Sequence, residues 1–258
     1  MKHHPFFTIV TCTKNSGKFL RKNLKSVASQ TFKDYEQIII DGSSIDKTVE
    51  ISKIFINKDQ NVKLFIYPPK GISNAFNLGI KKSLGKYLFF LNSDDYLYDN
   101  DVLKNVSIFL SKNPDLDWMY GRINVIRENG KKIGEFPKWK IFQFPHKYLL
   151  KYINFIPHQG VFMKRSVIKR FGGFNENLKA NMDYDLWLRI AQKTKWNFYD
   201  RLISNYTVRE GSVSSSYDNR NSVLNEFENI QGKHLNIFEA KIAEKLNILL
   251  IKINKIYR

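Results

Sequence analysis

Short apolar runs alternate with helix-like segments over the first hundred residues of the chain. Four runs have the length and composition of buried strands, and they span residues 8–13, 37–40, 62–67 and 87–91. Between them, apolar residues recur at helical spacing over residues 19–30, 47–57 and 72–83. This alternation predicts an α/β fold with a mostly parallel, doubly wound, Rossmann-like sheet flanked by helices.

The alternation is looser after residue 100. We expect strands at residues 118–120, 123–127, 159–163, 196–199 and 203–208, and helices at residues 102–110, 166–171 and 183–192. Residues 136–157 are irregular, aromatic and basic, which is typical of a loop or lid over a site. The pattern predicts one α/β domain over residues 1–220, with halves at 1–100 and 101–220, and a C-terminal helical extension over 221–258.

Polar residues follow each of the four early strands, at residues 11–15, 41–44, 68–74 and 92–95. Right-handed crossovers place the ends of parallel strands at one edge of a sheet, where open α/β folds bind ligands. We therefore expect a nucleotide-binding crevice at this edge. The sequence has no GxGxxG motif and no Walker lysine loop, so neither a dinucleotide-binding domain nor a P-loop enzyme is indicated.

Two adjacent carboxylates, Asp94 and Asp95, follow the fourth strand. Two carboxylates held close together raise each other's pKa, because like charges repel. A divalent cation between them removes this repulsion, since hard cations prefer carboxylate oxygens as ligands. The alternative is a polar turn in which one of the two aspartates caps the following helix.

Composition limits the class of protein. With 258 residues, 43% of them hydrophobic, the chain can bury a large core. Cys12 is the single cysteine, which excludes an intramolecular disulfide, and the five histidines form no zinc motif. We see no signal peptide and no membrane-spanning run, so we expect a cytoplasmic protein.

The net charge of +18 suits a nucleic-acid partner, an anionic membrane surface or an anionic substrate. A general bias of the amino-acid composition towards lysine would also explain part of the positive charge. A basic nucleic-acid-binding module is thus an alternative to an enzyme. The sequence contains no nucleic-acid-binding motif, and its carboxylates gather at the predicted strand ends, so we expect no nucleic-acid partner.

Several motifs occur together in the order found in one enzyme family. They are residues 11–15, DGSSIDKT at 41–48, LNSDD at 91–95, HQGVF at 158–162 and GGFNENLKANMDYDLWLR at 172–189. Over residues 6–215 the chain resembles the family 2 glycosyltransferases, which have the GT-A fold. The resemblance implies transfer of a sugar from a nucleotide-sugar donor, with a UDP-sugar expected, to a hydroxyl of a saccharide acceptor, with inversion at the anomeric carbon. It also implies that residues 1–100 bind the nucleotide and residues 101–220 the acceptor.

The resemblance further implies a donor site. Asp95, with Asp94 beside it, would hold Mn²⁺ or Mg²⁺ at the diphosphate, and Asp41 would hydrogen-bond the base unless it forms an Asx-turn. His158 and Arg209 would lie near the acceptor or the phosphates, and their alternatives are a structural histidine and an ordinary surface arginine. The expected donor-binding residues are Thr11, Thr13, Asn15, Asp41, Ser43, Asn74, Asn77, Asp94, His158 and Arg209.

An inverting transfer needs one general base on the acceptor side. Asp183 matches the catalytic carboxylate of the family, and Asp185 is the second candidate. Alternatively, Asp183 caps its helix and Asp185 complements the helix dipole. The chain departs from the family pattern, which carries Pro, Tyr, Asp and Glu, at Cys12, Lys14, Asn74 and Met182. A catalytically inactive glycosyltransferase-like scaffold is therefore another alternative.

The end of the chain has the pattern of a basic amphipathic helix. Its apolar residues recur at helical spacing and are Ile242, Leu246, Leu249, Leu250, Ile253 and Ile256. Such a helix binds anionic membrane surfaces, although a helix that packs on its own domain or on a second subunit of a homodimer has the same pattern. With a polyprenyl-linked saccharide as acceptor, membrane attachment would place the protein on the inner face of the cytoplasmic membrane. It would there build a bacterial surface glycan, such as a capsule or lipopolysaccharide.

Overall fold

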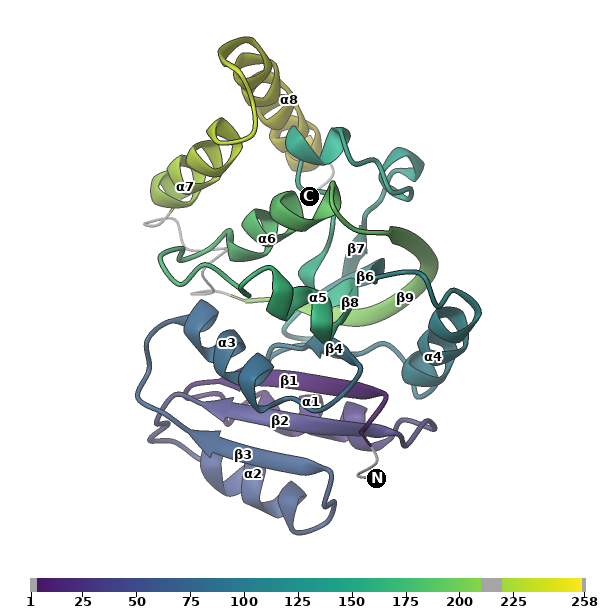
Figure 1. Ribbon diagram of the computed structural model, residues 1–258. Helices are drawn as coiled ribbons and strands as arrows, with labels where there is room; N and C mark the ends of the chain where they lie inside the picture. The colour runs from purple at the N-terminus through teal and green to yellow at the C-terminus, as the bar shows by residue number, and fades with distance from the viewer. Residues whose placement is uncertain (1–3, 210–219, 257–258) are drawn as a thin grey trace.

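The computed structural model describes residues 4–209 and 220–256 and shows an α/β fold built on one curled sheet (Figure 1). Its strands follow the order β3-β2-β1-β4-β8-β6-β9-β5, and β7 pairs with β6. The strand bounds are β1 Phe7–Thr13, β2 Tyr35–Asp41, β3 Val62–Ile66, β4 Tyr87–Phe90, β5 Tyr96–Leu97, β6 Trp118–Arg127, β7 Lys132–Phe136, β8 Val161–Lys164 and β9 Trp196–Val208.

The first four strands form the parallel part of the sheet. β1 lies between β2 and β4, and β3 pairs with the outer side of β2. Every residue of β1, β2 and β4 is buried, as expected for parallel strands that helices cover on both faces. The predicted α/β fold with a mostly parallel sheet is confirmed.

The second half of the sheet mixes strand directions. β8 runs antiparallel to β4 and β6, whereas the long strand β9 pairs in parallel with β6. The pairing of β6 with β9 shifts register near Gly121, where a Cβ atom would lie 2.5 Å from Ile203 Cγ1. The sequence predicted two short strands on either side of this point in both β6 and β9. Each pair is instead one continuous strand that an irregularity bends.

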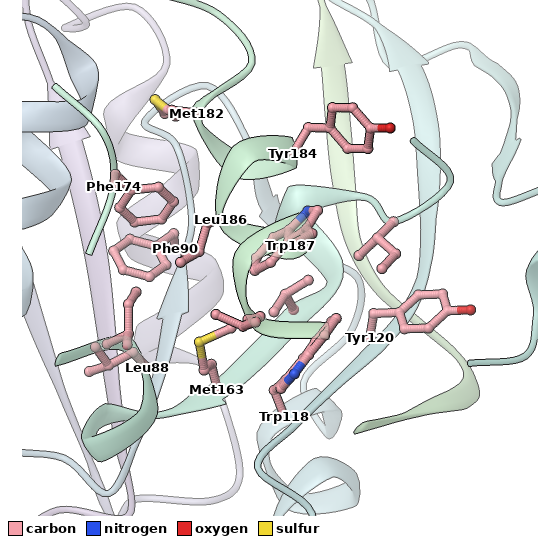
Figure 2. Packing of buried hydrophobic residues seen from close by; sticks show 14 of the residues in the cluster. Leu88, Phe90, Trp118, Tyr120, Met163, Phe174, Met182, Tyr184, Leu186 and Trp187 are labelled. Atoms are coloured by element: carbon pink, nitrogen blue, oxygen red, sulfur yellow. The ribbon is translucent and has the colours of Figure 1, made fainter. Parts of the chain in front are cut away.

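Helices cover both faces of the sheet. Their bounds are α1 Leu20–Ala28, α2 Thr48–Ile56, α3 Ile72–Lys82, α4 Val102–Lys112, α5 Arg165–Arg170, α6 Met182–Ala191, α7 Arg220–Gly232 and α8 Ile237–Ile256. α1, α2 and α4 pack on one face, and α3, α5 and α6 pack on the other. Figure 2 shows Leu186 of α6 beside Phe90, and Trp187 of the same helix above Trp118. The rings of Trp118 and Trp187 stack 5.4 Å apart, so the sheet fixes the position of α6.

The irregular segment at residues 136–157 is anchored to the core. It contains short 3₁₀ turns at Lys140–Phe142 and Leu149–Lys151. Tyr120 Oη donates to the backbone carbonyl of Phe142 at 2.6 Å, and Leu150 is fully buried. The sequence prediction of an irregular aromatic segment is thus correct, but part of the segment belongs to the core.

The helix α7 packs onto the domain although it lies in the predicted extension (Figure 1). Phe227 stacks on Tyr184 of α6 with 4.6 Å between ring centroids, and Ile230 is buried. α8 begins beside α7, and Glu239 accepts a hydrogen bond from Tyr152 Oη at 3.2 Å. The side chains of residues 247–258, which include the four last apolar positions of the predicted amphipathic helix, lie outside the described residues. Among the residues described, no helix is both long and apolar enough to cross a membrane.

Candidate active site

Side-chain hydrogen bonds join the loops at the carboxyl ends of the parallel strands. The backbone N–H of Asn15 donates to Ser44 Oγ at 2.8 Å, which links the loops after β1 and β2. Ser43 Oγ donates to a carbonyl just after β3 at 3.1 Å. Ser93 Oγ donates to Ser16 Oγ at 2.9 Å and adds the loop after β4. The four polar segments therefore form one continuous edge, where the sequence predicted a crevice.

Asn15 and Ser43 share an uncommon backbone conformation at this edge. Their φ angles are 48° and 56°, in the left-handed region that few residues other than glycine adopt. Asn15 Oδ1 accepts the Ile45 N–H at 3.0 Å, which holds the two loops in this shape. Both side chains are exposed, and backbone strain of this kind clusters at ligand-binding sites. Their roles in donor binding stay predictions.

Asp41 is fully buried at the end of β2. Its Oδ1 accepts the backbone N–H of Ser44 at 2.9 Å, and its Oδ2 accepts the Ser44 hydroxyl at 2.5 Å. The side chain therefore forms an Asx-type turn, although with Ser44 rather than with the neighbouring Gly42. In this conformation the Asp41 carboxylate is therefore buried and hydrogen-bonded within its own loop, and its role at the base stays a prediction.

Thr11 points away from the edge into a buried polar network. Its Oγ1 accepts a hydrogen bond from Gln37 Nε2 at 3.0 Å and lies 3.4 Å from Asn23 Oδ1. Asn23 in turn donates to the carbonyls of Asn92 and Asp95, so it fixes the loop after β4. Thr11 is therefore a supporting residue rather than one that faces a donor. Thr13 lies at the end of β1, where its buried Oγ1 has no hydrogen-bond partner among the described residues.

Asn23 is a buried polar residue of this edge that the sequence analysis did not identify. It lies on the buried face of α1 together with Leu20, Leu24 and Val27. An amide on an otherwise apolar face costs free energy unless it is hydrogen-bonded, and this was the signal that could have identified it.

Asp95 is buried, with 1% of its surface exposed. Its Oδ1 accepts the backbone N–H of Thr207 at 2.8 Å, and its Oδ2 has no hydrogen-bond partner among the described residues. Burial, followed by the neighbouring Asp94 carboxylate, raises the pKa of Asp95 well above its usual range. The Asp95 side chain therefore ties the loop after β4 to β9.

Asp94 is the more accessible of the two carboxylates. Its Oδ2 accepts a hydrogen bond from Arg209 Nε at 2.5 Å, and 14% of its side chain is exposed. The Arg209 guanidinium also lies over the ring of Phe19, 5.5 Å from its centroid. The structure thus brings together two of the expected donor-binding residues, Asp94 and Arg209.

The donor atoms at this position suit a divalent cation. Within residues 4–209 and 220–256, no group of three or more histidine, cysteine, aspartate or glutamate side chains surrounds a common point. Mg²⁺ and similar ions need only one or two carboxylates when substrate phosphates supply further ligands. Asp94, with the unpartnered oxygen of Asp95 behind it, fits that requirement in type of ligand.

His158 lies in an aromatic cluster rather than among polar groups. Its ring stacks on Phe76 with 5.1 Å between centroids and is 5.8 Å from Phe90. Neither ring nitrogen has a hydrogen-bond partner among the described residues. Burial lowers the pKa of His158 to about 4, so the imidazole is neutral at pH 7. This environment favours the structural interpretation over a role at the phosphates.

Asn74 and Asn77 face the loop before α6. Asn77 Nδ2 donates to the carbonyl of Phe174 at 2.9 Å, and Asn77 Oδ1 accepts the Phe174 N–H at 2.9 Å. Both asparagines also donate to the Glu176 carboxylate, at 2.9 and 2.8 Å. These contacts place the start of α3 beside the segment that leads to Asp183. The sequence analysis did not identify Glu176, although it lies in the recognised motif.

Asp183 lies in the first turn of α6 and is half-buried. Its Oδ1 accepts the backbone N–H of Tyr184 at 2.7 Å. Burial of the carboxyl raises the pKa of Asp183 to about 6, and the nearby Glu226 carboxylate acts in the same direction. The group can therefore take up and release a proton near neutral pH.

Asp185 makes different contacts. It is 6% exposed, and its Oδ2 accepts from Arg189 Nε at 2.9 Å one turn along α6. Arg189 also donates to the carbonyls of Phe171 and Gly173, so the Asp185–Arg189 pair fixes the loop before the helix. This structural role makes Asp185 a poor candidate for the base.

The fold is shared with solved glycosyltransferase structures. The structure of S. aureus TarS in complex with UDP-GlcNAc matches with a TM-score of 0.72 and 22% identity, over 87% of this chain and 65% of that one. A mannosyltransferase of Pyrobaculum calidifontis in complex with GDP-Man and Mn²⁺ matches with a TM-score of 0.65 and 16% identity, over 81% and 59%. This chain thus spans about two thirds of the TarS chain and has the GT-A fold.

Sequence comparison identifies the family within this fold. The model of glycosyl transferase family 2 matches residues 8–172. The PGL/p-HBAD biosynthesis glycosyltransferase of Mycobacterium bovis is 29% identical over 186 residues, which cover 72% of this chain and 69% of that protein. An uncharacterized glycosyltransferase of Methanocaldococcus jannaschii is 28% identical over 210 residues, or 79% and 71% of the two chains. The chain belongs to glycosyltransferase family 2.

Proposed function

We propose that the protein is an inverting glycosyltransferase that moves a sugar from a nucleotide-sugar donor to a hydroxyl of a saccharide acceptor. The observation that supports this most is Asp183, a half-buried carboxyl in the first turn of α6 whose pKa burial raises to about 6. A general base works best when its pKa lies near the working pH. Asp185, the competing carboxylate, is paired with Arg189.

Asp183 would remove the proton from the acceptor hydroxyl as its oxygen attacks the anomeric carbon. The attack comes from the face opposite the diphosphate, so the new glycosidic bond forms while the bond to the β-phosphate oxygen breaks. The electron pair of the broken bond stays on the diphosphate. Inversion at the anomeric carbon follows from this single displacement.

Negative charge then develops on the leaving diphosphate. Arg209, which lies beside Asp94, would bind a phosphate oxygen and offset part of that charge. A divalent cation, Mn²⁺ or Mg²⁺, would stabilise the remaining charge as a Lewis acid. The sequence analysis placed this ion at Asp95, with Asp94 beside it. Because Asp95 is buried against β9, we assign the ion to Asp94 and a supporting role to Asp95.

We favour a UDP-sugar as donor because the TarS structure, with the higher TM-score of the two described above, contains UDP-GlcNAc. The relative from Mycobacterium bovis is named as a PGL/p-HBAD biosynthesis glycosyltransferase. We further propose that this protein transfers a hexosyl group to a saccharide acceptor that is part of a surface glycan or is linked to a lipid. An exposed surface of apolar and basic side chains, which includes Ile237, Phe238 and Lys241, agrees with a membrane-bound acceptor.

The test is an assay of turnover with a panel of UDP- and GDP-sugars, with and without manganese. The released nucleoside diphosphate is the quantity measured. We expect release with one donor, and we expect Asp183→Asn and Asp94→Ala to abolish it. Asp115→Asn is the matched control because its side chain is 83% exposed. Full turnover by Asp183→Asn would contradict the proposed base. The absence of release with every donor would instead favour an inactive scaffold.

A further inference from the structure

The extension beyond the α/β domain supplies a carboxylate to the segment that carries the proposed base. Glu226 of α7 accepts three backbone N–H groups in a row. Its Oε1 accepts from Asn181 at 2.7 Å and from Ala180 at 3.0 Å, and its Oε2 accepts from Lys179 at 2.8 Å. The side chain of Asn181 also donates to the carbonyl of Val223 at 2.9 Å.

These three residues lead directly into α6. The first N–H groups of a helix have no partner within the helix and are usually capped by a side chain from the preceding residue. Asn181 occupies the capping position of α6, but its side chain makes no capping hydrogen bond. Glu226 of α7, which is 45 residues after Asn181 in the chain, instead binds the N–H groups of Asn181 and of the two residues before it.

Other contacts of α7 act on the same region. Phe227 stacks on Tyr184, the residue after Asp183. Gln231 Nε2 donates to Tyr184 Oη at 3.2 Å and to the carbonyl of Tyr152 at 2.9 Å. α7 thus holds α6 and the irregular segment at residues 136–157 together.

We propose that Glu226 is a positioning residue that fixes residues 179–181 and so sets the place and the environment of Asp183. This inference rests on the proposed role of Asp183 as base. It makes α7 part of the active site rather than an appendage to the α/β domain.

The charge of Glu226 adds an electrostatic effect to the positioning. Burial is the larger cause of the raised pKa of Asp183, and the Glu226 carboxylate raises it further. The Tyr184 N–H opposes both effects. Asp185 and Arg189 of the same helix pair with each other. His234, which follows α7, lies within electrostatic reach of both, as well as of Lys151 and Lys233. Removal of the Glu226 charge should therefore lower the pKa of Asp183.

Glu226→Gln tests the inference because the side chain keeps its shape and loses its charge. Glu228→Gln is the control, since Glu228 is an exposed glutamate on the same helix. Carbon-13 NMR of the carboxyl groups follows the titration of Asp183, identified by the signal that Asp183→Asn removes. We expect Glu226→Gln to lower the pKa of Asp183. We also expect it to speed hydrogen exchange at the Lys179 amide, because glutamine keeps one acceptor oxygen for Ala180 and Asn181 and loses the oxygen that Lys179 uses.

The same variants are then assayed with the donor that the panel of UDP- and GDP-sugars identifies. We expect Glu226→Gln to lower kcat by about tenfold with an unchanged KM for the donor, and to move the acid limb of the kcat profile to lower pH. Glu228→Gln should match the unmodified protein in every measurement. Glu226→Asp, which keeps the charge, should leave the acid limb in place.

An unchanged pKa of Asp183 in Glu226→Gln would overturn the inference, and so would a loss of stability with no change in the titration or the pH profile. These results differ from failure of the proposed function. In that case Asp183→Asn keeps its turnover, whatever Glu226→Gln does. The NMR titration needs no donor, so it decides the inference even then.

Discussion

At the scale of single residues, the environment separates carboxylates that are neighbours in sequence. Asp183 and Asp185 are two positions apart on α6, yet one is a desolvated carboxyl and the other is held by Arg189. Asp94 is partly exposed beside Arg209, whereas Asp95 is buried under the Thr207 N–H. In each pair, burial and hydrogen bonding leave one carboxylate available for chemistry.

The raised pKa of Asp183 should make this residue costly to stability. The folded protein holds the Asp183 proton up to about pH 6, and the unfolded chain releases it nearer pH 4. The protonated Asp183 carboxyl therefore makes its full contribution to the free energy of unfolding below the unfolded pKa, and this contribution is lost as the pH rises through the folded pKa. Asparagine does not titrate. As the pH rises from about 5 to about 8, we therefore expect the free energy of unfolding of Asp183→Asn to increase by about 1 kcal/mol relative to that of the unmodified protein.

Urea unfolding at the two pH values measures this change, with Asp115→Asn as the exposed control. A constant difference between Asp183→Asn and the unmodified protein across this range would show that the Asp183 pKa is not raised. In activity, the rate of the unmodified protein should fall as pH drops below about 6, because the base becomes protonated.

Asp94 and Asp95 should respond differently to removal. Asp95→Ala leaves the buried Thr207 N–H without its acceptor, which costs about 1–3 kcal/mol of stability. Asp94→Ala breaks a partly exposed ion pair and should cost less than about 1 kcal/mol, yet abolish manganese-dependent turnover. Chemical denaturation and manganese binding by paramagnetic resonance separate the two effects. Equal losses of stability would count against the supporting role of Asp95.

The sequence could show which loops meet but not which side chain each loop presents. Strand and helix alternation placed Asp41, Asp94 and Asp95 at one edge, and the contacts between these loops confirm that edge. The same alternation could not show that Thr11 turns inward to Gln37, or that His158 stacks on Phe76. Those orientations depend on partners far apart in sequence.

At the scale of elements, the junction between α3 and the segment before α6 couples the two halves of the domain. Ser73 Oγ donates to the carbonyl of Leu178 at 3.2 Å, and Asn77 binds both backbone groups of Phe174. Gly173 adopts a φ of 71°, and a Cβ atom there would lie 2.5 Å from Asn77 Oδ1. The first half of the domain, which we predict to bind the nucleotide, thus contacts the segment that precedes Asp183.

Loss of Asn77 should loosen this junction. Asn77→Ala leaves the N–H and the carbonyl of Phe174 without partners, so we expect a loss of about 1–3 kcal/mol in the free energy of unfolding. Asn74→Ala is a matched control, because Asn74 makes an exposed hydrogen bond to Glu176 and should cost less than about 1 kcal/mol. Urea unfolding measures both variants. Similar values for the two would contradict the anchoring role of Asn77.

The contribution of α7 could not be predicted from the sequence. Periodicity indicated a helix after residue 220, and the structure confirms one. Nothing local to Glu226 distinguishes it from Glu228, since both are glutamates in a polar stretch. Only the folded chain shows that Glu226 faces the N–H groups of residues 179–181.

At the scale of the whole molecule, exposed apolar side chains lie on two segments that touch each other. Ile237 and Phe238 at the start of α8 are 82% and 74% exposed, and Phe144 and Tyr148 are 57% and 76% exposed. The hydrogen bond from Tyr152 to Glu239 joins the segments. Exposed lysines lie on both of them, at Lys138, Lys140, Lys241 and Lys245. We propose that these segments bind an anionic membrane surface.

Such a surface should bind anionic lipid with help from both charge and apolar area. We expect the protein to float with vesicles that contain phosphatidylglycerol and not with neutral phosphatidylcholine vesicles. Binding should weaken as salt increases, because screening shortens the reach of the lysine charges. The double variant Ile237→Asp and Phe238→Asp should lose most of this binding, since each aspartate removes apolar contact and adds repulsion. Ile108→Asp on α4, 45% exposed, controls for a general change in charge. If the double variant and this control float equally well, the start of α8 does not contact the lipid.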